Sequence, residues 1–551
     1  MGLHLGEGVR VLVEGLKSGW DGVLFSAPPG YGESFSRLVN SVTRELGLSR
    51  FLYIVPVGGV VEGVFEEIGS GQVGGIGGSL FWGEEFVVSG LDWFLICLHR
   101  GCPINNPEFR EVIRAHLFSS FIYFNEPHLG IYGGPPFYSG AVLATYSLYR
   151  LGVPFVYRSG TLPSSFIEDF LDTVSGGGGE GVIVDVIPPC SECRGRRQSL
   201  FTRYSIKYIS VEDREFFEQA TEVGWRYNIS KRETLDREIT DALESGYRAV
   251  RVVERIGDAV SEYENFIRVL GEEKIGLIHE WLTPSDRRVV FEKLSRGSID
   301  LLVATPCIES SPSIREFNYL YTDVPLKYTA GIVPRIDSII VRTGFIGGED
   351  SETGNIVFVE DIDYPELHRE VYDLFTRRGP VNPRLPLMDR EKYKDWIGYL
   401  WLLDKYYLEH LPVSSIERFQ RDIIRVFTSV SSGEFFEDIC GLLGYSYVPV
   451  LPNPDDLGIS WDSLLDGISD YVISIDYRVL RRRLKWFLGD GGFVDVVFWD
   501  EKGDLFIDSV ELDRVSNWLS SCSSLRELFY RYKVQALVLR RDLYRVEKGF
   551  V

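Results

Sequence analysis

Residues 25–34 of the chain read Phe25-Ser26-Ala27-Pro28-Pro29-Gly30-Tyr31-Gly32-Glu33-Ser34. The apolar run Gly22–Ser26 leads into this glycine-rich turn. Apolar side chains follow it at helical spacing, at Phe35, Leu38, Val39, Val42 and Leu46. The turn therefore lies at a predicted strand-to-helix junction, which is either an ordinary connection or a phosphate-binding loop.

The turn lacks one group that a phosphate-binding loop requires. Such a loop uses glycines to bring backbone N–H groups to the triphosphate, a lysine for the outer phosphates and a Ser or Thr hydroxyl for magnesium. Gly30, Gly32 and Ser34 meet this pattern, but Glu33 stands at the lysine position. At about 4 Å and an effective dielectric near 20, the reversal changes each charge pair from roughly −4 to roughly +4 kcal/mol. We therefore expect ATP binding to be strongly disfavoured.

The composition is that of a globular protein with several domains. The 551 residues are 44% hydrophobic, which is enough for about three domains with separate cores. No apolar run approaches the roughly 20 residues of a membrane span, and the N-terminus lacks a basic segment followed by an apolar one. We therefore expect a cytoplasmic protein without membrane association.

Cysteine content and charge restrict the partners. The seven cysteines are an odd, scattered set, which fits a reducing compartment. Cys190 and Cys193 form one Cys-x-x-Cys without a second pair, so we expect a structural or incidental role and no metal site. The formal net charge of −22 opposes indiscriminate binding to polyanions, so a nucleic-acid site must be a local groove.

Short apolar strands alternate with helical segments, as in doubly wound parallel sheets. The expected strands are Phe51–Val55, Phe86–Val88, Phe121–Phe124, Val153–Tyr157, Arg248–Val253, Ile275–His279, Leu301–Ala304, Asn318–Thr322 and Ile356–Val359. Glycines at 176–179 and the proline pair at 188–189 interrupt the alternation. The sequence thus predicts two α/β lobes on either side of this break.

These signals predict four segments. We expect a first lobe at residues 1–178, a linker or insertion at 179–230, a second lobe at 231–378 and a mixed α+β accessory domain at 379–551. The last segment is expected to contain a helix at Trp396–Leu408 and a β-hairpin made of Phe493–Trp499 and Leu505–Val510.

Polar motifs follow the predicted strands of both lobes. In the first lobe they are Tyr53-Ile54-Val55-Pro56, Val88-Ser89-Gly90-Leu91-Asp92, Asn125-Glu126-Pro127-His128 and Ser159-Gly160-Thr161-Leu162-Pro163. In the second lobe they are Leu277-Ile278-His279 with Asp286-Arg287, the run Leu302–Glu309 with Thr305, and the run Asp337–Phe345 with Arg342.

In this order, the motifs resemble those of the paired RecA-like domains of superfamily-2 helicases. Tyr31, the Ser-x-Thr-Leu-Pro at 159–163 and the Asp-Ser-x-Ile-x-Arg at 337–342 are most similar to the helicase subunit of type I CRISPR interference systems. In that family, the helicase uses ATP and magnesium to unwind target DNA and reel it toward a histidine-aspartate (HD) nuclease. The resemblance covers Ala27–Phe345 and implies two RecA-like parallel-sheet lobes.

The resemblance also implies roles for single positions. The nucleotide site would contain Gly30, Gly32, Glu33, Ser34 and Asn125. The catalytic positions would be Glu126, His128 and Arg342. The nucleic-acid contacts would be Pro56, Asp92, Ser159, Thr161, His279 and Thr305.

Four positions depart from the family pattern. Glu33 replaces lysine, Asn125 replaces the magnesium-binding aspartate, Val341 replaces glutamine and Phe345 replaces the second arginine. We therefore predict an inactive ATPase without a cofactor. An active but atypical helicase, with a residue such as Arg37 in place of the lysine, and another superfamily-2 role such as RNA remodelling are the alternatives.

The histidines indicate whether the sequence contains the HD nuclease motif. None of the seven is followed by aspartate, so the family reading implies that the HD nuclease is a separate chain. The leading hypothesis is a degenerate helicase of an antiviral CRISPR assembly, which binds single-stranded DNA weakly on its own and contacts effector subunits and the nuclease.

Two basic clusters are candidate nucleic-acid or partner surfaces. The first is Arg478, Arg481, Arg482, Arg483 and Lys485 with Trp486, and the second is Arg531, Lys533, Arg540, Arg541 and Arg545 with Tyr532 and Tyr544. Cations beside aromatic rings suit a strand groove, but a solvated helix face explains either cluster equally well.

Overall fold

The structure is a computed structural model. It describes residues 6–20, 22–28, 31, 42–55, 72–74, 86–90, 120–125, 145, 148, 153–160, 181–187, 194, 198, 207–222, 224–310, 317–328, 332–346, 353–360, 363–376, 447–487, 490–500, 504–520 and 533–550. None of the helices in these parts combines the length and the apolar character needed to cross a bilayer.

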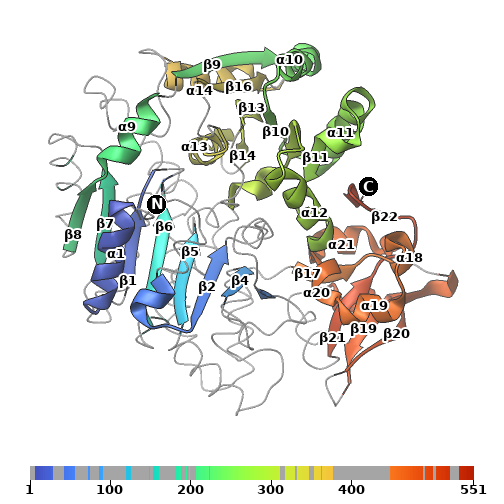
Figure 1. The fold of residues 1–551 in the computed structure, drawn as a ribbon. Helices are drawn as coiled ribbons and strands as arrows, with labels where there is room; N and C mark the ends of the chain where they lie inside the picture. The colour runs from blue at the N-terminus through green and yellow to red at the C-terminus, as the bar shows by residue number, and fades with distance from the viewer. Residues whose placement is uncertain are drawn as a thin grey trace.

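The first lobe is an eight-stranded sheet in which the paired strands run parallel (Figure 1). The strands are β1 (Gly22–Ser26), β2 (Arg50–Val55), β3 (Gln72–Gly74), β4 (Phe86–Gly90), β5 (Ser120–Asn125), β6 (Phe155–Ser159), β7 (Val182–Ile187) and β8 (Lys207–Glu212). Their order in the sheet is β3-β4-β2-β5-β6-β1-β7-β8. β1, β2 and β5 are buried along their whole length, as expected for central parallel strands that are covered on both faces.

Helix α1 (Glu7–Lys17) packs on β7 and β8. It buries Val9, Leu12, Val13 and Leu16, which recur at i, i+3, i+4 and i+7 and so form one apolar stripe. Helix α9 (Arg214–Glu222) follows β8 directly.

The second lobe is a six-stranded parallel sheet. The strands are β9 (Gly224–Lys231), β10 (Ala249–Val252), β11 (Ile275–Ile278), β12 (Leu301–Ala304), β13 (Tyr319–Asp323) and β16 (Thr353–Glu360). The order is β11-β12-β10-β13-β16-β9. A short antiparallel pair, β14 (Leu326–Tyr328) and β15 (Ile332–Pro334), follows β13.

Helices cover both faces of this second sheet. Helices α10 (Arg232–Glu244) and α11 (Ile256–Leu270) contribute to the core on one face. Helices α12 (Pro284–Ser295), α13 (Ile336–Thr343) and α14 (Pro365–Thr376) contribute to the core on the other. Neighbouring strand residues alternate between the two cores, which makes the lobe doubly wound.

The segment expected as a linker, residues 179–230, instead supplies strands to both sheets. β7 pairs with β1, β8 pairs with β7, and β9 pairs with β16 over eight residues. The sequence reading gave the Gly and Pro residues around this segment more weight than the apolar run Val182–Ile187. That run is buried in full, and burial of an apolar strand outweighs the local signals at its ends.

The C-terminal module has a five-stranded mixed sheet of order β18-β17-β21-β19-β20. Its strands are β17 (Tyr447–Leu451), β18 (Ile473–Asp476), β19 (Phe493–Trp499), β20 (Leu505–Glu511) and β21 (Val534–Val538). β19 and β20 form the expected antiparallel hairpin. The helix expected at Trp396–Leu408 lies outside the described residues.

Short helices surround this third sheet, and a small hairpin ends the chain. The helices are α18 (Pro454–Leu457), α19 (Trp461–Asp466), α20 (Ile468–Tyr471), α21 (Tyr477–Arg482) and α22 (Leu512–Trp518). The terminal hairpin pairs β22 (Tyr544–Arg545) with β23 (Gly549–Phe550). It lies beside α12 of the second lobe (Figure 1).

Candidate functional site

The carboxyl ends of three central strands meet at one edge of the first lobe. β6 lies between β1 and β5, with Ser26 paired to Ser159 and Asn125 paired to Arg158. Ser26, Ser159 and Asn125 are all buried. In open parallel α/β sheets, ligands bind at such an edge, so this is where a nucleotide site would be sought.

Arg158 connects the turn to the end of β5. Its Nη1 donates to Asn125 Oδ1 at 3.3 Å, and its Nη2 donates to the Tyr31 carbonyl at 2.5 Å. The guanidinium thereby links a residue of the glycine-rich turn with Asn125, the position at which the resemblance implies a magnesium ligand. The sequence reading missed Arg158, although a charged residue within the apolar strand Phe155–Ser159 signals a polar partner.

Tyr31 is held by its side chain as well. Its hydroxyl donates to Asp213 Oδ2 at 2.8 Å and accepts from the Gly8 backbone N–H at 2.9 Å. The Glu7 N–H donates to the same carboxylate oxygen at 3.1 Å, so an anion caps the start of α1. Burial, with the hydrogen bond to Asp213, raises the pKa of Tyr31 well above its ordinary value. Residue 31 of the turn is therefore bound to both α1 and the segment after β8.

Most of the first-lobe positions named by the resemblance lie outside the described residues. These are Gly30, Gly32, Glu33, Ser34, Pro56, Asp92, Glu126, His128 and Thr161. Their arrangement stays a prediction.

The described residues of this edge do not fit a magnesium-nucleotide. Magnesium prefers carboxylate and water oxygens in octahedral geometry, whereas Asn125 is neutral and its oxygen accepts a hydrogen bond from Arg158. Within the described ranges, no group of three or more His, Cys, Asp or Glu side chains is placed to hold a metal ion.

In the second lobe, Arg342 on α13 is completely buried and bound at every guanidinium nitrogen. Its Nε donates to Glu309 Oε1 at 2.8 Å, and its Nη2 donates to Glu254 Oε1 at 2.7 Å. Its Nη1 donates to Thr322 Oγ1 at 2.7 Å and to the Asp323 carbonyl at 3.1 Å. Burial alone would lower the pKa of Arg342, but Glu254 and Glu309 outweigh it and raise the pKa.

A second buried arginine adjoins this network. Arg251, on β10, donates through Nε and Nη2 to the Glu262 carboxylate at 2.9 and 3.1 Å, and through Nη2 to Asp323 Oδ1 at 2.6 Å. Asp323 thus bonds to both arginines, through its carboxylate and its carbonyl. The sequence reading missed Arg251, Glu254, Glu262 and Asp323. The signal was an arginine in the buried strand Ala249–Val252, since buried charges are paired.

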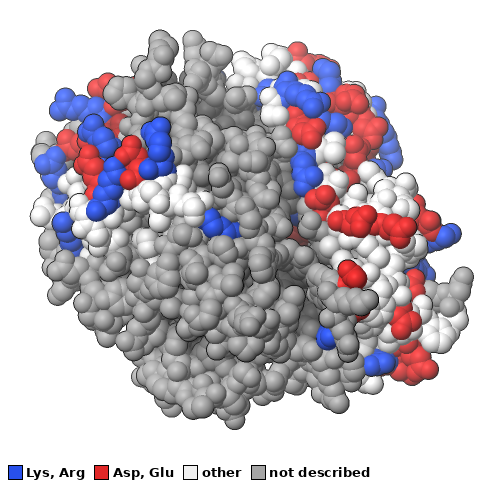
Figure 2. Space-filling model, turned by 60° about the horizontal axis from the view of Figure 1, so that its bottom comes forward, with Lys and Arg blue, Asp and Glu red and all other residues white. Residues whose placement is uncertain are grey.

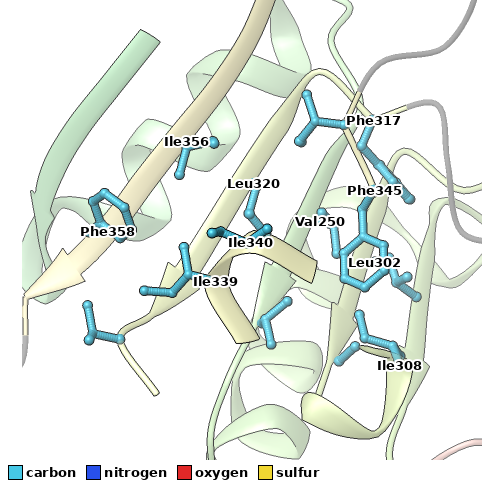
Figure 3. Close-up of a cluster of buried hydrophobic side chains, with 14 of the residues drawn as sticks. Val250, Leu302, Ile308, Phe317, Leu320, Ile339, Ile340, Phe345, Ile356 and Phe358 are labelled. Carbon is cyan, nitrogen blue, oxygen red and sulfur yellow. The ribbon is translucent and has the colours of Figure 1, made fainter. Parts of the chain in front are cut away.

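Phe345 lies in the apolar core of the second lobe. Phe345 is 3% exposed and packs among the core side chains of this lobe (Figure 3). The neighbours labelled there include Val250, Leu302, Ile308 and Phe317. Val341 is buried as well. The two positions at which the family carries glutamine and arginine therefore hold buried apolar side chains.

His279 and Thr305 are turned into the protein. His279 is fully buried, and its Nδ1 accepts from the Trp281 N–H at 3.1 Å. Its Nε2 lies 3.0 Å from the Lys548 carbonyl, so Nε2 carries the hydrogen. Burial lowers the pKa of His279 to about 4. Thr305 is buried and donates to Glu280 at 2.6 Å.

The terminal hairpin covers this face of the second lobe. The Tyr544 hydroxyl donates to Asp286 and accepts from the Thr283 N–H. Lys548 pairs with Glu264 at 3.0 Å. The rings of Trp486 and Phe550 stack at 5.8 Å, and Trp281 of the second lobe packs against both edge to face. Two aromatic residues expected to sit beside basic groups, Trp486 and Tyr544, are therefore used in this contact between modules.

The basic clusters are also partly neutralised. Arg478 forms a two-point pair with Asp476, and Arg541 pairs with Asp455. Arg531 and Tyr532 lie outside the described residues. On the face drawn in Figure 2, the described Lys and Arg side chains stand in small groups among Asp and Glu. These described groups form no continuous basic track on that face.

The fold resembles solved structures at low sequence identity. One is titled a CRISPR-associated protein (13% identity, TM-score 0.51), and the match covers 92% of this chain and 70% of that one. Another is Cas3 of T. fusca (13% identity, TM-score 0.51), with coverage of 99% and 70%. A third is T. fusca Cas3 with AMPPNP (12% identity, TM-score 0.51), with coverage of 97% and 67%.

No protein-family model and no curated protein matches the chain. The structural matches, at this identity, establish the fold. It consists of two RecA-like parallel-sheet lobes followed by a mixed α+β module, and it is similar to the fold of T. fusca Cas3.

Proposed function

We propose that the chain is a CRISPR-associated, helicase-like protein of antiviral defence that has lost its ATPase chemistry and acts by binding DNA or effector subunits. The fold shared with T. fusca Cas3 supports the class of protein. The match spans about 70% of that chain, so the activity and partners of the whole relative are part of the proposal.

The observation that carries this proposal is the burial of the last motif in the second lobe. An arginine that stabilises a transferring phosphoryl group must direct its guanidinium at the nucleotide, and such an arginine is worth roughly 10³ to 10⁵ in rate. Arg342 is fully buried and bound to Glu254, Glu309 and Thr322. The other position, Phe345, is a core residue. Neither side chain presents a charge to a ligand.

The first lobe supports the same conclusion independently. Asn125 lacks the negative charge that a magnesium ligand supplies, and its oxygen accepts from Arg158. In the sequence, Glu33 would repel the phosphates. The altered positions lie in two different lobes, so restoring the family's residue at one of them would leave the other positions altered.

Weak DNA binding by the isolated chain belongs to the proposal. His279 and Thr305 are buried, the described basic groups on the face drawn in Figure 2 are interspersed with acidic ones, and the net charge is −22. Binding to single-stranded DNA should therefore be weak and strongly salt-dependent. We propose that a separate HD nuclease chain or effector subunits strengthen it. Tight, salt-insensitive binding by the chain alone in fluorescence anisotropy would contradict this part.

The ATPase part is tested by calorimetry with MgATP and by phosphate release, each with and without single-stranded DNA. We expect neither binding in the physiological range nor turnover. Glu33→Lys should restore some MgATP binding, because the glycines and Ser34 remain. It should restore no turnover, because Asn125 and Phe345 still cannot stabilise the charge of the transition state. Glu33→Gln is the matched control, since it removes the repulsion without adding attraction.

The alternative is an active but atypical ATP-dependent DNA helicase that works with a separate HD nuclease. The retained Gly30, Gly32, Ser34 and Glu126 favour it. Robust DNA-stimulated turnover by the natural sequence would establish this alternative and overturn the loss of ATPase chemistry.

A further inference from the structure

We propose that Arg158 is a positioning residue, a built-in cation that ties the glycine-rich turn to the end of β5 and replaces a bound metal and nucleotide in holding this edge together. The inference deepens the proposed function and rests on it, because it explains how the edge keeps its shape without MgATP.

The location of Arg158 allows one side chain to reach both segments. β6 is the strand between β1 and β5, and Arg158 is paired with Phe25 on one side and with Asn125 on the other. Tyr31 follows β1 by a few residues, and Asn125 is the last residue of β5. A guanidinium presents several N–H donors in a rigid plane, so it can serve the Tyr31 carbonyl and Asn125 Oδ1 together.

The side chains of Arg158 and Asn125 are chemically complementary. A carboxylate at position 125 would carry a negative charge, and in a nucleotide site magnesium neutralises that charge. An amide is neutral, so its oxygen can accept from Arg158 without a metal. Asn125 is thus a hydrogen-bond partner of Arg158 at a position where the resemblance implies a metal ligand.

The turn is held from two sides at the same residue. The Tyr31 side chain is bound by Asp213 and by the start of α1. Its carbonyl is bound by Arg158 on the other side. Protein groups therefore hold residue 31 through both its side chain and its carbonyl, whereas in a working loop phosphate contacts contribute to the order of the turn.

We call the pair of hydrogen bonds from Arg158 to the Tyr31 carbonyl and to Asn125 Oδ1 the bridge. Hydrogen–deuterium exchange of the full chain without nucleotide tests it. We expect Arg158→Met to speed exchange at least tenfold in peptides that cover residues 25–35 and 120–130, and to leave the β19–β20 hairpin unchanged. Arg158→Lys should fall in between, because one ammonium cannot span both oxygens. Arg44→Met, at a side chain that is 79% exposed, is the matched control and should change nothing.

Asn125→Asp should change the exchange rate in the direction opposite to Arg158→Met. In magnesium-free buffer it should slow exchange in the same two peptides, because the bond to Arg158 becomes charge-assisted. A residue that served only as a metal ligand would instead loosen the edge when it gained an unpaired charge. If Arg158→Met does not fold, Arg158→Lys and Asn125→Asp still decide the question.

Failure of this inference is separable from failure of the proposed function. Unchanged exchange in Arg158→Lys, or faster exchange in Asn125→Asp, would overturn the bridge whatever the nucleotide results. MgATP binding by the natural chain that leaves the exchange effects intact would overturn the proposed function and spare the bridge as a structural contact. The proposal that the bridge holds this edge together in place of a nucleotide requires two results. MgATP must fail to bind, and the exchange effects must appear.

Discussion

Replacing Arg342 by methionine should destabilise the second lobe by about 3 kcal/mol. The substitution keeps most of the side-chain volume but removes the cation from a fully buried site. Breaking a buried pair by removing one partner costs about 3 to 5 kcal/mol, since the other charge is left uncompensated. Glu309 is the carboxylate that would be left buried without its cation, because its side chain is only 5% exposed. Arg335 lies 3.9 Å from it, close enough for some compensation, so the lower end of the range applies.

The second substitution in this test neutralises the carboxylate that Arg342→Met leaves behind. Glu309→Gln, added to Arg342→Met, should recover about 1 to 3 kcal/mol, because replacing both members of a buried pair is often close to neutral. The amide still accepts from Ser338, which bonds to Glu309 in the natural chain. The two substitutions must therefore be non-additive in a double-mutant cycle.

Urea unfolding followed by tryptophan fluorescence and circular dichroism measures these differences. The control is Arg288→Met, because Arg288 and Asp470 form a partly exposed pair with 38% and 42% side-chain exposure. Its loss should cost no more than about 1 kcal/mol. A cost below about 1 kcal/mol for Arg342→Met, or a double variant less stable than either single one, would refute the reasoning.

Three further predictions concern the contact between the terminal hairpin and the second lobe. Gly549→Ala should loosen the hairpin, because φ is +72° there and a Cβ would lie 2.5 Å from His279 Cε1 and 2.8 Å from the Trp281 carbonyl; limited proteolysis should then cut the C-terminus faster than in Gly458→Ala, which has a similar φ and an open environment. Tyr544→Phe should cost about 1 to 3 kcal/mol in urea unfolding, because Asp286 and the Thr283 N–H lose a buried partner; an unchanged midpoint would argue against a docked hairpin. His279 is buried as the neutral form, with its pKa lowered from 6.5 to about 4, so the unfolded chain binds a proton first and stability falls as the pH drops from about 6.5 to about 4. Between pH 7.5 and pH 5 the natural chain should lose about 2 kcal/mol more than His279→Gln, and equal losses would refute the assignment.

The alternation of apolar strands and helical segments was readable without the structure. Central parallel strands such as Phe51–Val55 and Leu301–Ala304 are continuous apolar runs because both faces are covered, and β19 and β20 flank a short turn. These features depend on neighbours in the chain. The two lobes and the hairpin could therefore be predicted from the sequence.

Pairing between distant segments could not be predicted in the same way. β7 and β8 join the first sheet, and β9 joins the second at its edge beside β16. Each of these strands follows glycine, proline or charged residues that resemble a linker. Which edge an isolated strand joins depends on the surface that the rest of the lobe offers, and a local pattern does not contain that information.

The sequence by itself determined two α/β lobes, the order of their motifs and the loss of charge at Asn125 and Phe345, because each of these is a property of residue type and local spacing. Only the tertiary structure decided what the remaining polar residues do. Arg342 meets Glu254, which is 88 residues away, and His279 meets Lys548, which is 269 residues away. An arginine or histidine carries the same chemistry wherever it lies in the chain. Burial and the partners brought by folding decide whether that chemistry faces a ligand or the protein interior.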